Sequence, residues 1–379
     1  MDWLTGSKQN EIKKLISQLA DSARRDVAAK SLTQIGPEAV PALIDALQTQ
    51  DLSLLPVYQY FLSQAPSARP ELIKALSTAQ PIIRARVAEI FGINKDASAF
   101  PALVKALGDE YPQVRSQAAL ALSNIGDDKV IPALMSLLKD REDEVRMAAC
   151  VTIGKFRDPS TFDEIANVLL DDLKIDVRRT AARVLGETKH PAALPFLMEA
   201  LRDSFWWYER EQNVVDLLQA IQNMGSMAVG PLIEALSDRE GRVRKFAAMI
   251  LGELGDTRAI EPLGMAIYDL HHEIGREAAE SLGLFGAKAL DILTEALNHP
   301  EGMVRGHAVV ALGKIQDVRV VPPLIKMLSD PDREVKKLAI QSLGNLKDER
   351  ALPALKEIAS NRADKELSML AKQVLESKQ

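Results

Sequence analysis

One ten-residue motif, Val-Arg-x-x-Ala-x-x-x-Leu-Gly, recurs along the whole chain. Successive copies begin 29 to 32 residues apart, apart from one interval of 36 residues. A fixed period of this length is typical of repeat architectures, so it constrains the fold more than any other feature. Clear copies begin at Val114, Val145, Val177, Val243, Ile274, Val304 and Val335, and weaker ones at Arg24, Leu54, Ile83, Asn213 and Leu367.

Each copy follows an apolar stretch that usually opens at or just after a proline, as at Pro41, Pro101 and Pro132. Leucines spaced three or four residues apart mark the buried stripe of a helix. Proline is tolerated in the first turn, where its missing N–H would be unpaired anyway. The motif itself ends at a glycine suited to a left-handed helix cap. Each unit therefore reads as helix, turn, helix, and the alternation typical of strands is absent.

A helix pair of about 31 residues cannot bury its apolar faces alone, so neighbouring pairs must stack. The sequence predicts an all-α fold, a right-handed α-solenoid of about twelve helix-turn-helix repeats. We expect one continuous solenoid over residues 1–379. Its ends carry more Lys and Glu, which predicts an N-terminal cap at 1–35 and a C-terminal cap at 350–379.

The amino-acid composition disfavours several classes of function for this chain. There are 53 acidic residues against 47 Lys and Arg, a formal net charge of −6, which disfavours nucleic acid as the main partner. The single cysteine cannot form an internal disulfide. No apolar run approaches the roughly 20 residues that span a bilayer, and no targeting segment is visible, so we expect no membrane partner and a cytoplasmic location.

The proline-initiated helix, the Asp turn and the Val-Arg-x-x-Ala-x-x-x-Leu-Gly helix together resemble the short HEAT-like repeats of phycobilisome bilin lyases. The resemblance covers nearly the whole chain. It implies an armadillo-type α-solenoid whose second helices line a concave surface. Members of the family include chromophore lyases, a di-iron hydroxylase that acts on a modified lysine, and scaffolds with no chemistry. The fold does not choose among these functions, so the choice depends on the site residues.

An Asp five residues before the motif is followed by the motif Arg, as in Asp109 and Arg115 or Asp238 and Arg244. We call this recurring series of Asp and Arg residues the ladder, and one interpretation is that it binds anions. The other is structural: the Asp caps backbone N–H groups, and the Arg bonds turn carbonyls or the next unit's Asp. We favour the structural interpretation. Val214 stands where the seventh repeat would carry this Arg, so that repeat should not join the ladder.

The third, fourth and seventh motif positions should face outward, which includes Ser116, Ala148 and Gly306. Apolar groups among them lie beside basic ones, as a protein-binding groove usually presents. Alternatively, long side chains simply cover neighbouring apolar surface. The candidate groove residues are Leu120, Met147, Val151, Arg179, Arg183, Gln219, Lys245, Phe246, Met249 and Arg276.

The 36-residue interval adds about five residues, including the aromatic run Phe205, Trp206, Trp207 and Tyr208, at the turn between two helices. Insertions on one face of a solenoid often carry its binding role. These aromatics could anchor a partner at the groove rim or stack on a flat tetrapyrrole. They could equally fill an uneven junction between repeats.

Signals for chemistry are weak. His190 and His299 each precede a proline and read as turn residues, and His272-Glu273 is a single pair where the di-iron family needs several. Cys150 occupies a motif position usually held by Ala, so it should be buried and inert. We expect no metal and no catalytic residue. Nucleic acid could contact Arg179, Arg183 and Lys245, but acidic neighbours interrupt that stripe.

The sequence therefore predicts a protein–protein interaction scaffold that binds a protein or peptide in its concave groove, without a cofactor. The alternative is a bilin lyase or chromophore carrier. In that case a tetrapyrrole bilin would be bound and a phycobiliprotein subunit would be the partner.

Overall fold

The computed structural model describes residues 2–78, 80–203, 206, 214–361 and 363–376. Across these residues the regular structure is helical, and they contain no β-strand. The predicted all-α fold is confirmed. The chain divides into two compact units, Met1–Phe196 and Leu197–Gln379, and we describe each unit by itself. One continuous solenoid with caps at 1–35 and 350–379 stays a prediction.

The described part of each predicted motif copy lies in the second helix of a helix pair or begins at most one residue before it, which confirms the repeat assignment. We call these the second helices. In the first unit they are α2 (Arg25–Ile35), α4 (Leu55–Gln64), α6 (Pro81–Asn94), α8 (Pro112–Ile125), α10 (Asp143–Phe156) and α12 (Ile175–Thr188). In the second unit they are α14 (Val215–Asn223), α16 (Gly241–Leu254), α18 (His272–Leu284), α20 (Gly302–Lys314), α22 (Arg333–Leu346) and α24 (Lys365–Glu376).

The first helices of the pairs are mostly only two turns long. They are α1 (Asp2–Gln18), α3 (Val40–Ala46), α5 (Arg69–Ala75), α7 (Phe100–Ala106), α9 (Ile131–Leu137), α11 (Phe162–Asp171), α13 (Leu194–Ala200), α15 (Val229–Ala235), α17 (Ile260–Ala266), α19 (Leu290–Ala296), α21 (Val321–Met327) and α23 (Leu352–Ser360).

A turn of 3₁₀ helix leads into most of these first helices, so each pair enters its first helix through a fixed bend. In the fifth pair of the first unit, for example, the Asp127 side chain accepts a hydrogen bond of 3.0 Å from the backbone N–H of Lys129. Pro132 then occupies the first turn of α9, as expected where a backbone N–H would find no partner.

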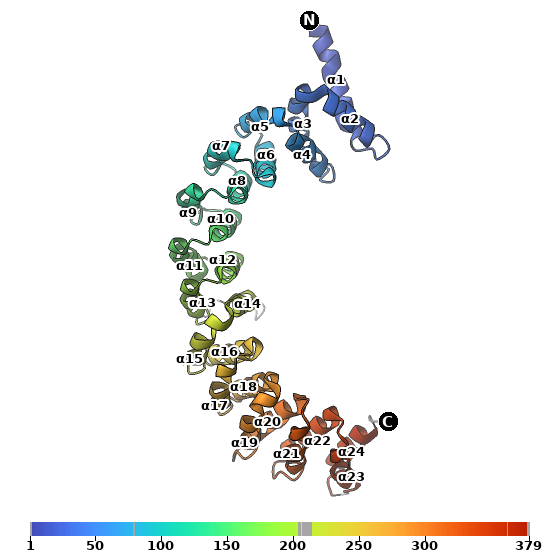
Figure 1. Ribbon diagram of the computed structural model, residues 1–379, viewed down its shortest axis with the longest axis vertical. Helices are drawn as coiled ribbons and strands as arrows, with labels where there is room; N and C mark the ends of the chain where they lie inside the picture. Colours follow the sequence, from blue (N-terminus) through green and yellow to red (C-terminus); the bar gives the residue numbers. More distant parts are fainter. Residues whose placement is uncertain (1, 79, 204–205, 207–213, 362, 377–379) are drawn as a thin grey trace. The chain divides into compact units, whose positions relative to one another are not determined.

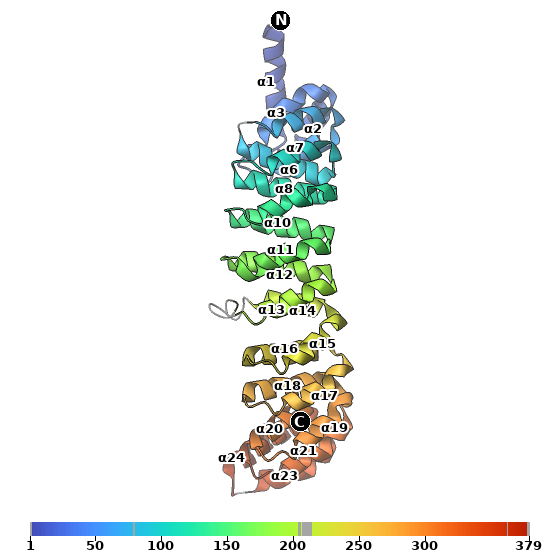
Figure 2. The same ribbon diagram turned by 90° about the vertical axis from the view of Figure 1, so that its left-hand side faces the viewer.

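Within each unit the second helices form one layer and the first helices the other (Figure 1). Figure 2 shows the pairs of each unit stacked as successive rows. The core lies between the two layers, where leucines such as Leu103 of α7, Leu122 of α8 and Leu134 of α9 are fully buried. Because each pair packs only on its neighbours, the same buried positions repeat from pair to pair.

The motif glycine is not a helix cap, which corrects the sequence-based expectation. Gly92 lies inside α6, and the left-handed residue that ends this helix is Lys95, with φ of 50°. A Cβ at Gly92 would lie 2.8 Å from the Cα of Ala121 in α8. Likewise, a Cβ at Gly154 would clash with Val184. The motif glycine is therefore needed because adjacent second helices approach closely, not because of its backbone freedom.

Candidate binding surface

Buried arginine–aspartate pairs join one repeat to the next. Arg115 donates to the Asp140 carboxylate through Nε and Nη2, at 2.8 and 2.7 Å. Its Nη1 donates to the carbonyl of Asp109 at 2.9 Å. Equivalent pairs are Arg84–Asp109, Arg146–Asp172, Arg244–Asp269 and Arg305–Asp330. In these five pairs every side chain is at most 13% exposed. The pairs therefore leave little surface for an anion to bind, which confirms the structural interpretation of the ladder.

The electrostatics of these pairs agree with that role. Burial would raise the pKa of the Asp109 carboxyl, but hydrogen bonds from Arg84 and from the backbone N–H of Tyr111 hold that pKa below its ordinary value. At Asp330, the hydrogen bonds from Arg305 are the leading cause of a lowered pKa and outweigh burial. Both carboxylates therefore stay ionised and committed to their arginines near neutral pH.

Among the residues that the structure describes, the junctions that follow α14 and α18 in the second unit depart from this pattern. Although Val214 lacks the motif arginine, Asp238 is not left without one, because Arg202 donates to it at 2.7 Å. The expectation that this repeat stays outside the ladder is corrected. At the other junction Gly275 replaces the arginine and His299 replaces the aspartate. His299 Nδ1 accepts from the backbone N–H of Glu301 at 3.2 Å, the local role that an aspartate has elsewhere.

The solvent-facing side of the second helices, which we call the second-helix face, contains the candidate groove residues of the first unit. Leu120 of α8 and Met147 and Val151 of α10 are all half-buried. Arg179 and Arg183 follow on α12, where they pair with carboxylates of their own helix. Arg179 is 3.4 Å from Asp176, and Arg183 is 3.0 Å from Glu187. The predicted juxtaposition of apolar and basic groups on consecutive helices is therefore present, with the basic groups partly neutralised.

The second-helix face of the second unit is built in the same way. Lys245, Phe246 and Met249 of α16 are half-buried, and the Lys245 ammonium lies 6.0 Å from the centre of the Phe246 ring. Arg276 of α18 is exposed, and its side chain approaches Glu280 at 3.9 Å. Gln219 of α14 is also exposed and hydrogen-bonds Gln222 and Asn223.

Three of the positions expected to face outward are instead buried. Ser116 is 2% exposed, and its hydroxyl is 3.1 Å from a Glu144 carboxylate oxygen of the next second helix. Ala148 and Gly306 are buried as well. These positions lie where adjacent second helices touch, so only a long side chain placed there reaches solvent.

Of the aromatic insertion, Phe205, Trp207 and Tyr208 lie outside the residues that the structure describes. Trp206 is fully buried rather than exposed at a rim. Its indole Nε1 has no hydrogen-bond partner within the described part of the chain. Trp206 therefore has no surface to offer a partner, and it belongs to the apolar interior of the second unit.

Three of the residues considered for chemistry, Cys150, His190 and His299, have structural roles. Burial raises the pKa of the Cys150 thiol to about 12, which keeps it protonated. His190 and His299 each accept a hydrogen bond from the backbone N–H two residues on, as turn residues do. Among residues 2–78, 80–203, 206, 214–361 and 363–376, no cluster of three or more His, Cys, Asp or Glu is arranged to hold a metal ion.

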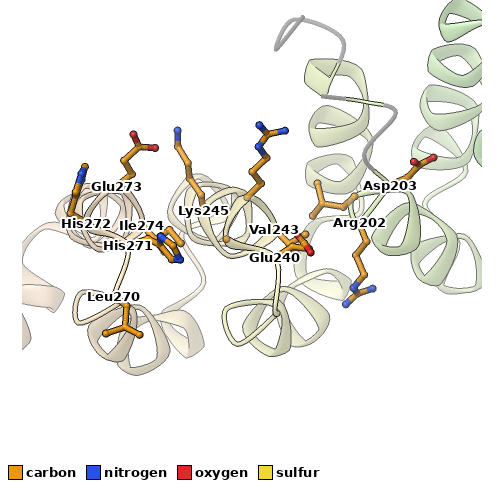
Figure 3. Close-up of a pocket in the computed structure, with 13 residues that line it drawn as sticks. Arg202, Asp203, Glu240, Val243, Lys245, Leu270, His271, His272, Glu273 and Ile274 are labelled. Atoms are coloured by element: carbon orange, nitrogen blue, oxygen red, sulfur yellow. The ribbon is translucent and has the colours of Figure 1, made fainter. Parts of the chain in front are cut away.

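A cavity of about 860 Å³ lies in the second unit between the turn at Leu201–Asp203 and the N-terminal ends of α16 and α18. Figure 3 shows Lys245 and Glu273 extending from these helices to the same side, while Leu270 points the other way. Three basic and three acidic side chains line this cavity, so its lining does not favour one sign of charge. The basic ones are Arg202, Arg242 and Lys245, and the acidic ones Asp203, Glu240 and Glu273.

In the part of the chain that the structure describes, no helix is both long enough and apolar enough to cross a membrane.

The stacked helix pairs, the periodic core and the inter-repeat ladder define the class of protein as an α-solenoid. The family follows from a model of HEAT repeats, which matches residues 69–152, 131–217, 212–283, 229–305 and 290–376. Because these matches cover most of the chain, it belongs to the HEAT-repeat family. A model of the PBS lyase HEAT-like repeat matches residues 25–49.

Comparison with curated proteins finds no match. Among solved structures, Kap121p bound to Ste12p superposes with a TM-score of 0.58 at 14% identity, covering 96% of this chain and 49% of that one. Kap95p, from a study of its binding to RanGDP, gives a TM-score of 0.53 at 13% identity, covering 94% and 58%. The chain thus spans about half the length of these relatives, and at such identities the likeness concerns the fold.

The CpcE–CpcF complex of phycocyanin lyase from Nostoc sp. PCC7120 is 19% identical, with a TM-score of 0.35, covering 59% of this chain and 92% of that one.

Proposed function

We propose that this chain is a protein-interaction scaffold rather than an enzyme, and that it binds a protein or peptide segment on its second-helix face. The observation that carries the proposal is the repeated presentation of partly exposed apolar side chains beside charged ones. In the first unit these are Leu120, Met147 and Val151, and in the second Phe246 and Met249. Surfaces of this mixed kind are typical of protein-binding sites.

The repeat itself favours an extended partner. Equivalent positions recur on consecutive second helices, so a partner that lies across them meets a similar surface at each step. We infer that the second helices line a concave groove and that the partner occupies it. Arg179 and Arg183 would orient the partner, because exposed ion pairs within one helix contribute little and their arginines can exchange to a partner's carboxylates.

The same fold binds proteins elsewhere. Kap121p has been solved bound to Ste12p, bound to Nup53p and bound to the SUMO protease Ulp1p, with TM-scores of 0.58, 0.51 and 0.50 against this chain. These complexes support a protein partner as the class of ligand. The partner of this chain is a separate question, because identities of 13 to 15% transfer the fold alone.

Affinity capture tests the scaffold proposal. The chain would be used as bait in a lysate of its source organism, beside the double variant Arg179→Glu and Arg183→Glu. We expect a defined set of proteins on the original chain and a loss of those that depend on this face. Unchanged capture by the charge-reversed chain would overturn the proposed role of these arginines.

A second candidate is the bilin lyase or chromophore carrier, which the PBS lyase HEAT-like match over residues 25–49 favours. In that function Arg179, Arg183 or Lys245 would pair with the propionates of the pigment. Adding a free bilin should then shift its absorbance band, and an unchanged spectrum would argue against this function.

A further inference from the structure

A largely apolar notch opens on the second-helix face of the second unit, between α18, α20 and α22. Its volume is about 420 Å³. Gly306 lies at its floor, Val310 and Leu338 contribute partly exposed walls, and Met303 stands at its lip with 55% of its surface exposed. Every residue that lines it belongs to the described part of one unit. We call it the α20 notch.

The notch exists because α20 has a glycine where its neighbours carry long side chains. Gly306 is the third residue of its motif copy, and the same position holds Arg276 in α18 and Lys337 in α22. A Cβ at Gly306 would lie 3.0 Å from Cδ1 of Leu338, so the Leu338 side chain packs next to the glycine. Val310 is one turn further along α20. The result is a pocket with a largely apolar interior at a point on the second-helix face where the neighbouring helices carry charged side chains.

The inner wall of the notch is also uncharged. Burial lowers the pKa of His307, and the nearby Arg276 lowers it further, so its imidazole is neutral near pH 7. His307 Nδ1 is buried without a hydrogen-bond partner among the described residues, and it lies 3.5 Å from where a Cβ of Gly275 would stand. This nitrogen therefore faces α18, and the notch itself favours an apolar occupant.

The rim of the notch is acidic at one end. Three carboxylates line it, Glu280, Asp332 and Glu334, against one guanidinium, that of Arg276. Arg276 lies 3.9 Å from Glu280 at the α18 end. At the α22 end Asp332 and Glu334 lie together, and Glu334 is 68% exposed, 3.3 Å from a Lys337 ammonium that also pairs with Glu366. A basic group next to the apolar occupant would meet its complement at this end.

We propose that the α20 notch is an anchor site for a peptide segment of a partner protein, and that it takes one large apolar side chain flanked by Lys or Arg. A pocket of this size suits such an anchor, and buried anchors dominate the affinity of protein interfaces. The acidic end selects the basic flank through charge complementarity. The inference rests on the proposed scaffold function and names the partner chemistry at one place on the face.

The test uses the full chain labelled with ¹³C-methyl methionine and follows the Met303 methyl resonance, which the variant Met303→Leu identifies by its loss. Three probes are titrated: acetyl-Lys-Ala-Phe-Ala-Lys-amide, the same peptide with Glu for Lys, and the same peptide with Ala for Phe. We expect a saturable shift with the first, about fivefold weaker binding of the second, and no shift with the third. No shift with any probe, or equal affinity for the Lys and Glu peptides, would overturn the proposal.

Three variants separate site occupancy from general effects. Val310→Trp fills the notch and should abolish the shift, whereas Val318→Trp changes a 63% exposed valine in the turn before α21 and should leave it intact. Glu334→Lys should remove the preference for the Lys peptide. Unfolding midpoints of all three variants confirm that they fold. If the notch does not bind these peptides but the scaffold proposal is right, the chain still captures the partners that depend on Arg179 and Arg183. The notch proposal and the scaffold proposal can therefore be contradicted independently.

Discussion

The Arg305 guanidinium forms a bidentate ion pair with the Asp330 carboxylate across a repeat junction, with Nε and Nη2 donating at 2.8 and 2.7 Å. The two side chains are 10% and 3% exposed. Nη1 of the same arginine donates to the backbone carbonyls of His299 and Pro300, both at 2.8 Å. One side chain thus fixes its own turn and the turn of the next repeat.

Removing the charge of this carboxylate should strongly destabilise the second unit. In Asp330→Asn the buried guanidinium loses its counter-ion, which costs about 3 kcal/mol in the free energy of unfolding. Chemical denaturation measures this loss. Glu187→Gln is the matched control, because its exposed pair with Arg183 should contribute no more than about 0.5 kcal/mol. Equal losses in the two variants would contradict a structural role for the ladder.

The same pair predicts how stability depends on acid. The folded-state pKa of Asp330 is lowered, first by the hydrogen bonds from Arg305. The stabilisation is therefore present above the ordinary Asp pKa of about 4 and is lost as the pH falls through the lower, folded value. The free energy of unfolding should fall more steeply below pH 4 in the original chain than in Asp330→Asn. Parallel pH profiles would contradict the assignment.

Replacing a motif glycine even with alanine should lower the free energy of unfolding. Gly92→Ala places a Cβ 2.8 Å from the backbone of Ala121, so α6 and α8 must separate, which costs about 1–3 kcal/mol. Gly230→Ala in α15 is the control, because nothing lies within 4 Å of its Cβ position. That variant should be neutral or stabilising by up to about 1 kcal/mol. A neutral Gly92→Ala would argue against close helix contact there.

The Cys150 thiol should be unreactive in the folded protein. Its thiol is fully buried, with a pKa raised to about 12. Only the thiolate reacts with a disulfide reagent, so native protein should release no thionitrobenzoate from Ellman's reagent, whereas protein in denaturant should release one equivalent. Rapid reaction under native conditions would mean that α10 opens readily.

The motif alone predicted the helix pairs and the inter-repeat ladder. Periodicity identifies the buried stripe and the Arg–Asp spacing because both repeat with the architecture. It could not tell a glycine inside a helix from a glycine cap, since Gly92 and Lys95 differ by only one helical turn. Arg202 was missed as the partner of Asp238 because it lies outside the motif, and no periodic signal marks it.

The candidate surface was predictable only in part. Leu120, Met147, Phe246 and Met249 are partly exposed as expected, because their motif positions point away from the core. Ser116 and Gly306 are buried, since the contact between adjacent second helices depends on side-chain length. The α20 notch gave no sequence signal beyond a single glycine, because its walls come from different helices.

Site-specific photo-crosslinking tests the central claim most directly. Benzoylphenylalanine would replace Leu120 or Met249 on the second-helix face, and Lys105 of α7 or Lys326 of α21 on the first-helix side, where both lysines are exposed. Irradiation in a lysate of the source organism, read by mass spectrometry, should join the same partner protein to positions 120 and 249 and not to 105 or 326. Equal crosslinking from both sides, or none from the second-helix face, would contradict a scaffold that works through this face.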